Sequence, residues 1–150
     1  MNVASDDDRD EFGRRRLTER ERQDVLDLPL AAVWSTLTRA GRIHSVPVHF
    51  VTRGADIRVL TESDSVKCRN AQRTGRATLC IETTLHGADR RYATAEGPVH
   101  LERPITVEDL AALDRRYGRS DAVGFDAADF TDAVIMVLSP ESWIAWSDAD

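Results

Sequence analysis

The feature that most constrains the fold of this chain is a run of short β-prone segments, each ended by turn residues. Strands of about five to ten residues joined by tight turns pair with their neighbours in sequence, which favours an antiparallel sheet or barrel. The segment 133–139 is apolar on both faces and is predicted to be buried. The predicted strands are 31–38, 43–52, 57–61, 76–84, 91–102, 133–139 and 142–147.

The segment 43–52 differs between its two faces. Every second residue from Val46 to Phe50 is apolar, as expected of a half-buried strand. The opposite face carries Ser45, Pro47 and His49 and is unusually small and polar.

Three short helices are predicted among the strands. Thr18 and Thr106 each precede an acidic residue at the capping-box spacing of a helix start. Pro29 ends the first helix, while Ser65 can cap the start of the second and Gly75 closes it. The predicted helices are 18–28, 66–73 and 106–117.

These elements predict one mainly β (α+β) domain over 17–147, an antiparallel barrel of about six to seven strands with short helices. The segments 31–38, 43–52 and 57–61 are predicted to form a meander, in which each strand pairs with the next. Residues 1–16 carry the runs DDDRDE and RRR without apolar periodicity and are predicted to be a disordered tail.

Composition argues against several classes of function. Among the 150 residues, 20 Lys and Arg and 26 Asp and Glu give a net charge of −6. The arginines are scattered among acidic residues, whereas nucleic-acid binding needs a basic face. No apolar run approaches the roughly 20 residues of a membrane span. The two cysteines show no CxxC spacing and the acidic N-terminus does not resemble a secretory signal. We therefore expect a cytoplasmic protein without nucleic-acid or membrane partners.

The sequence lacks the motifs of common catalytic and cofactor sites. It contains neither GxGxxG nor GxxxxGK[ST], which argues against a Rossmann site and a P-loop. It also contains no HExxH motif, no Cys/His cluster and no GxSxG elbow. We therefore expect neither a metal centre nor a serine hydrolase.

The segment 61–70 has the residue types of an anion site. A predicted strand ends in hydroxyl residues, and a helix then begins with Lys67. Free N–H groups and partial positive charge at a helix N-terminus attract anions, and Lys67 adds a full charge. The same residues suit a plain N-cap on a surface helix, so both interpretations stay open. The candidate residues are Thr61, Ser63, Ser65, Lys67 and Asn70.

The order of these elements resembles the pyridoxamine 5′-phosphate oxidase-like, FMN-binding split-barrel superfamily. The resemblance rests on WSTL at 34–37, HSVPVHF at 44–50 and SVKCRN at 65–70, and it extends over roughly residues 30–117. Within the superfamily, the chain looks most like the actinobacterial branch that uses the deazaflavin coenzyme F420.

The resemblance implies a homodimeric split barrel that holds each cofactor in a cleft between subunits. The loop from Thr61 to Lys67 then binds the cofactor phosphate, with Asn70 nearby. Arg69 either reaches a phosphate or poly-glutamate tail or is a solvated helix residue. The strand under the flavin or deazaflavin ring is Ser45, Val46, Pro47 and Val48, and a flat ring accounts for its small face.

The function implied by this resemblance is a reductase that passes a hydride from reduced coenzyme F420 to a conjugated small-molecule acceptor. The alternatives are an FMN-binding oxidoreductase of the same fold and a non-catalytic flavin-binding or carrier protein. No dedicated catalytic acid is recognisable, and His49 and Tyr117 are the candidates. Glu62 departs from the pattern, because a negative charge in an anion loop is unfavourable unless it points outward.

Overall fold

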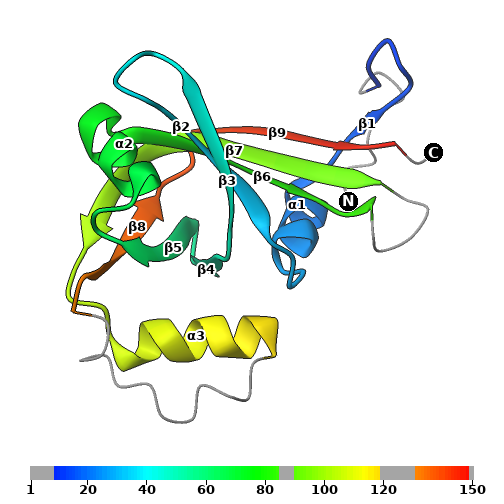
Figure 1. Cartoon of the computed structure of the whole chain (residues 1–150). Coiled ribbons are helices and arrows are strands. Elements are labelled where there is room, and N and C mark those ends of the chain that lie inside the picture. Colours follow the sequence, from blue (N-terminus) through cyan, green and yellow to red (C-terminus); the bar gives the residue numbers. More distant parts are fainter. Residues whose placement is uncertain (1–8, 85–89, 119–130, 149–150) are drawn as a thin grey trace.

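The computed structural model describes residues 9–84, 90–118 and 131–148, which form a bent antiparallel sheet with three short helices (Figure 1). The predicted mainly β (α+β) class is confirmed. The predicted loop at 85–89 and most of the predicted loop at 118–129 lie outside the described residues. The strands are β1 Arg15–Arg16, β2 Ala32–Leu37, β3 Ile43–Val48, β4 Val51–Arg53, β5 Asp56–Glu62, β6 Arg76–Glu82, β7 Arg91–Glu102, β8 Ala133–Leu138 and β9 Ser142–Ser147. The helices are α1 Glu19–Leu26, α2 Val66–Thr74 and α3 Val107–Tyr117.

The strands follow the order β3-β2-β6-β7-β8-β5-β4, with β9 paired to β7 and β1 paired to β9. The described residues thus form nine strands, more than the six to seven predicted, and the shortest are β1 and β4. Every residue of β8 is buried, as predicted. One alternate set of its side chains lies in the main core, and the other lies in a small core with Ile105 and Leu110.

Strand β7 joins the two parts of the sheet. Residues 91–98 of β7 pair with β6, with β9 or with both, and its last four residues pair with β8. The change of partner falls at Gly97 and Pro98. A Cβ on Gly97 would lie 2.2 Å from the carbonyl oxygen of Ser139, so only glycine lets the two backbones approach this closely.

The helix ends follow the predicted caps. Thr18 and Thr106 both form complete capping boxes, and the Ser65 hydroxyl accepts the N–H of Cys68. Gly75 ends α2 in the left-handed conformation, with φ of 70°. Within the described residues, no helix has the length and apolarity needed to cross a membrane.

The predicted meander is wrong, because 43–52 does not form one strand. Strand β3 ends at Val48, and β5 pairs with β4 and β8 instead of β3. The break falls at Phe50, whose side chain is fully buried. The hydroxyl of Tyr117 accepts the Phe50 N–H at 3.0 Å and lies 3.2 Å from its carbonyl oxygen. These backbone groups therefore find partners outside a strand ladder.

Residues 9–16, here called the arm, differ from the predicted disordered tail. The arm forms a tight turn with Gly13 at φ of 77°, and its strand β1 pairs with β9. Arg15 donates two hydrogen bonds to Glu21, at 2.9 and 2.8 Å. These charge-assisted bonds fix a segment that has no apolar periodicity in its sequence.

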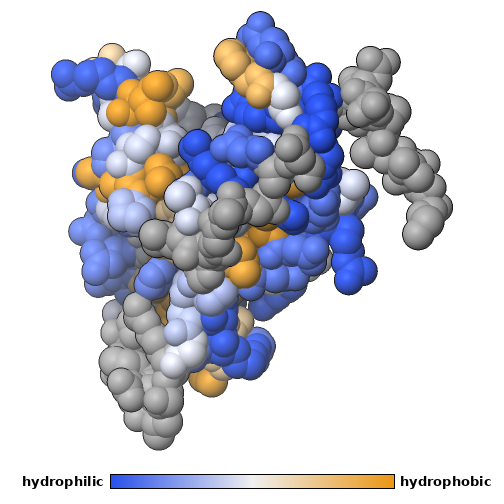
Figure 2. Space-filling view, turned by 90° about the vertical axis from the view of Figure 1, so that its right-hand side faces the viewer, coloured by the Kyte–Doolittle hydropathy of each residue, from blue (hydrophilic) through white to orange (hydrophobic). Residues whose placement is uncertain are grey.

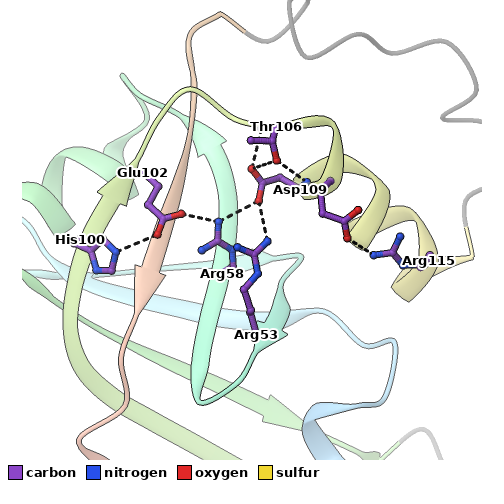
Figure 3. Close-up of polar contacts among 8 residues, drawn as sticks. Arg53, Arg58, His100, Glu102, Thr106, Asp109 and Arg115 are labelled. Carbon is purple, nitrogen blue, oxygen red and sulfur yellow. Dashed lines mark hydrogen bonds and ion pairs between the residues drawn. The ribbon is translucent and has the colours of Figure 1, made fainter.

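Helix α3 is held against the sheet by an ion-pair network around the buried Arg58 (Figure 3). Arg58 of β5 contacts Glu102 of β7 at 2.7 Å and Asp109 of α3 at 3.1 Å. Arg58 and Asp109 are both buried. Burial alone would raise the pKa of Asp109, but hydrogen bonds from Thr106 and the Arg58 guanidinium hold it below its usual value.

Candidate functional site

The side of β2, β3, β6, β7 and β9 that points away from the main core is here called the outward face. Its centre carries small side chains, among them Ser35 and Ser45, whose hydroxyl oxygens lie 2.8 Å apart. Two hydroxyls that share one hydrogen bond leave one O–H proton free for a ligand. The exposed apolar residues of the outward face are Val33, Leu37, Ile43 and Ile144.

A groove of about 390 Å³, here called the apolar groove, opens where β2, β3 and β6 meet. Its walls include Leu37, Ile43 and Ala77, together with Ser35 and Thr78. This volume lies within the range of small-ligand sites, and an apolar lining with a few hydroxyls is typical of them.

An ion-pair cluster borders the apolar groove. Arg76 contacts Glu96 at 2.7 Å and Glu141 at 3.1 Å. The Arg76 guanidinium lowers the pKa of Glu96, so this carboxylate stays ionised at neutral pH. Glu96 is therefore a poor proton donor.

A second groove, of about 590 Å³, lies along the exposed side of α2 and is here called the arginine groove. Val66, Arg69 and Arg73 recur at helical spacing, which places them on one face of α2. Arg39, from the β2–β3 turn, forms the opposite side. The lining residues include three arginines and no acid, so the groove suits an anion.

Asn70 joins the two grooves. It is buried, and its amide nitrogen donates to the hydroxyl of Thr36 at 3.2 Å. Its amide oxygen accepts two hydrogen bonds from Arg73, which also donates to the carbonyl oxygen of Leu37. Thr36 and Leu37 line the apolar groove, whereas Asn70 and Arg73 line the arginine groove. The two grooves therefore share one hydrogen-bonded wall.

The predicted phosphate loop lies where β5 meets α2. Thr61 is buried and its hydroxyl oxygen lies 3.1 Å from that of Ser65, which caps α2. The Ser63 N–H donates to the carbonyl of Asp132. Lys67 is half-buried on α2, and Glu62 is exposed, so its charge has access to water. The loop hydroxyls thus already bond to one another and to the helix end.

The structure separates the predicted cofactor residues into groups. Arg69 and Asn70 line the arginine groove. Ser45 and Pro47 lie on the outward face, but the alternating Val46 and Val48 side chains pack in or against the main core. The valines can therefore support a ligand only through their backbone. The residues Thr61, Ser63, Ser65 and Lys67 are not among those lining either groove.

Two groove arginines were not among the sequence candidates. Arg73 follows from the helical spacing of 66, 69 and 73, a pattern visible in the sequence once α2 is placed. Arg39 appears in the sequence only as a turn residue, and no local pattern places it beside α2. Chain reversal at the β2–β3 hairpin brings it there.

The candidate acids His49 and Tyr117 hold α3 against the barrel. Their rings stack, with centroids 4.2 Å apart. The Tyr117 hydroxyl lies within hydrogen-bonding distance of the Leu30 carbonyl and of both backbone groups of Phe50. Neither residue is among those lining the grooves. In the described part of the chain, no three His, Cys, Asp or Glu residues gather as a metal site would require.

Comparison with known proteins finds the same fold in solved structures. No family model and no curated protein matches the chain. An F420 reductase is 21% identical, with a TM-score of 0.71, over 85% of this chain and 98% of that one. A FAD-binding protein from Mesorhizobium loti is 13% identical, with a TM-score of 0.70, over 91% and 99%. A putative pyridoxamine 5′-phosphate oxidase from Listeria innocua is 14% identical, with a TM-score of 0.64, over 85% and 96%.

At these identities the likeness shows the fold. The chain shares the fold of these solved structures. One fold can carry many functions, so function has to be argued from the site.

Proposed function

We propose that this chain binds the deazaflavin coenzyme F420 as a homodimer and uses its reduced form to reduce a conjugated small-molecule acceptor. The observation that carries the proposal is the pair of adjoining grooves, one apolar and one lined by three arginines, joined through Asn70. When bound, the reduced deazaflavin supplies a hydride.

The outward face and the apolar groove fit a flat ring. Ser45 and Pro47 leave room above β3, and the Ser35–Ser45 pair offers a hydrogen-bond donor to a ring heteroatom. Leu37 and Ile43 supply apolar surface that such a ring would cover. The role of these residues is to orient the ring and keep water from one of its faces.

The arginine groove fits the charged end of the same ligand. The guanidinium groups of Arg39 and Arg69 have no hydrogen-bond or ion-pair partner among the described residues, so both are available for a phosphate or carboxylate. Lys67 lies in the first turn of α2, directly after the loop from Thr61 to Ser65, and can hold a further anionic group. FMN carries a single phosphate, so several cationic side chains favour a ligand with more than one anionic group.

The grooves offer no neutral carboxyl group for proton transfer. The Arg76 guanidinium keeps Glu96 ionised. The rings of His49 and Tyr117 stack on each other and hold α3 against the sheet. We therefore assign the proton that follows the hydride to solvent, which has access to the outward face. The protein's part is to bind and orient.

A titration of the purified protein with coenzyme F420 and, separately, with FMN tests the proposal. Ligand fluorescence reports binding in both cases. We expect micromolar or tighter binding of the deazaflavin and weaker binding of FMN. The reductase assignment then requires an acceptor that reoxidises the reduced deazaflavin. Stronger binding of FMN would favour a flavin oxidoreductase, binding without turnover would favour a carrier, and binding of neither would leave only the fold.

Charge-removal variants locate the anionic end of the ligand. The double variant Arg39→Ala with Arg69→Ala removes two charges of the arginine groove. The variant Lys67→Ala removes the charge in the first turn of α2. Loss of a charge-assisted contact costs about 1.5–3 kcal/mol, so affinity should fall about tenfold or more for each contact. Arg115→Ala is the matched control, because Arg115 pairs with the exposed Glu108 on α3. If all variants bind like the unmodified protein and stay folded, the anion assignment is wrong.

A further inference from the structure

We propose that the arm of one copy completes the apolar groove of a second copy, with Phe12 forming a wall that the groove's own chain does not supply. The proposal rests on the homodimer proposed above. It extends that proposal by giving residues 9–16 a place in the partner's cofactor site.

The arm presents Phe12 in a fixed position. The Asp10 carboxylate accepts the N–H groups of Phe12 and Arg14, at 3.0 and 2.9 Å, and the side chain of Arg14 at 2.7 Å. Strand β1 anchors the other end of the turn to β9. Phe12 nevertheless remains 74% exposed. An exposed large apolar side chain marks a contact surface when it belongs to a larger exposed apolar area.

Phe12 cannot reach the groove of its own chain. The apolar groove lies at β3 and β2, and the strands that follow across the sheet are β6, β7, β9 and β1. Neighbouring strands lie about 4.8 Å apart, so β1 lies roughly 24 Å from β3 along the sheet. In Figure 1 the arm and the β2–β3 hairpin project at opposite ends, both on the side of the sheet away from α1. The outward face lies between them.

The outward face and the arm together are self-complementary. Seven large apolar residues are exposed in the described part of the chain, and five of them belong to these two surfaces. Figure 2 shows the hydrophobic surface near the top of the molecule as small patches among hydrophilic residues. Two-fold packing places a patch against its own copy, so each Phe12 could meet a partner's groove rim at Leu37 and Ile43. The five residues are Phe12, Val33, Leu37, Ile43 and Ile144.

Charge supports the same pairing. Arg14 and Arg16 both lie over the ring of Trp146, at 5.7 and 4.9 Å from its centroid, and make the arm basic. The apolar groove is bordered by Glu96, Glu141 and their shared partner Arg76, so two carboxylates stand against one guanidinium and the rim keeps an excess of negative charge. A basic arm that approaches an acidic rim is attracted to it, which favours this docking over one in which two arms meet.

A cross-linking experiment on the full chain tests the proposal. Phe12→Cys and Ile43→Cys are introduced singly and together in a Cys80→Ser background, because Cys80 is half-exposed on the outward face. A disulfide needs Cα atoms within about 7 Å, so a bond between positions 12 and 43 must join two chains. We expect mild oxidation of the double variant to give a covalent dimer containing that bond. A bond between two copies of position 12, or a dimer without any cross-link, would overturn the proposal.

A second pair of variants links the arm to ligand binding. Phe12→Ser should weaken both dimerisation and binding of coenzyme F420 at least about fivefold, since it removes roughly 1 kcal/mol or more of apolar contact. Val107→Ser, at an exposed position on α3, should change neither. Cross-linking without cofactor binding would support the arm proposal and refute the proposed function. Cofactor binding without the cross-link would refute the arm proposal alone.

Discussion

The two parts of the sheet that meet at β7 are covered in different ways. Beside β8 and β5, helix α3 closes the outside of the sheet and fills a small core with Ile105 and Leu110. On the outward face, Leu37 and Ile43 remain 49% and 75% exposed. Helix α3 therefore covers one part of the sheet, whereas the outward face leaves apolar side chains and hydroxyl groups exposed.

This difference separates charged residues that are paired within the fold from charged residues that face an open groove. The charges beneath α3 are paired and buried, as in the contact of Arg58 with Asp109. Arg39 and Arg69, in contrast, line an open groove without an acidic partner among the described residues. Unpaired cations in a concave site favour an anionic ligand, whereas paired and buried ions fix the arrangement of elements.

We expect the largest loss of stability for a substitution in the ion-pair network beneath α3. Asp109→Ala leaves the buried Arg58 guanidinium with Glu102 alone and also breaks the capping box of α3. We expect a loss of about 3 kcal/mol or more in the free energy of unfolding, measured by urea titration.

Glu108→Ala is the matched control for this variant. Glu108 is the neighbouring acidic residue on α3 and pairs with the exposed Arg115. Exposed pairs contribute little, so its loss should cost less than about 1 kcal/mol. Equal effects for the two variants would show that the buried network does not hold α3.

We expect a smaller loss of stability at Gly97, where the two parts of the sheet meet in β7. Gly97→Ala places a Cβ 2.2 Å from the Ser139 carbonyl oxygen, so β7 and the β8–β9 turn must move apart. We expect the free energy of unfolding to fall by about 2 kcal/mol. Gly54→Ala serves as the comparison, because its Cβ would meet no atom within 4 Å and only its φ of 58° opposes the change. If Gly97→Ala were no worse than Gly54→Ala, the close approach would not be essential.

We expect the smallest loss of stability in the arm, where Arg15 contacts Glu21. Hydrogen bonds from Arg15 lower the pKa of Glu21 to about 2 from 4.5. Because the folded state favours the carboxylate, this pair stabilises the protein above pH 4.5, and the contribution is lost as the pH falls towards 2. Urea unfolding should show an advantage over Glu21→Gln on the order of 1 kcal/mol at pH 6 that vanishes in acid. Glu19→Gln, which leaves the contact between Arg15 and Glu21 intact, should keep the advantage at pH 6.

The sequence predicts local structure well where a local interaction decides it. Thr18, Ser65 and Thr106 begin helices because their side chains bond to backbone groups three residues away. Gly75 ends α2 because glycine adopts a positive φ without strain. The wrong prediction, a meander through 43–52, failed because Tyr117, distant in sequence, bonds the backbone of Phe50.

The candidate site shows the same division. The hydroxyls and cations of 61–70 are visible in the sequence, and so is the small face formed by Ser45 and Pro47. The sequence does not show that Arg39 lies beside Arg73, because hairpin geometry and helix packing bring these two residues together.

By itself the sequence determined the caps, the strand alternation and the buried character of β8, because each depends on side chains close together along the chain. Tertiary structure decided which strands pair across β7, how the arm lies on β9, and that Asn70 joins two grooves. These outcomes depend on contacts between distant segments, where burial and pairing of charges outweigh local preference.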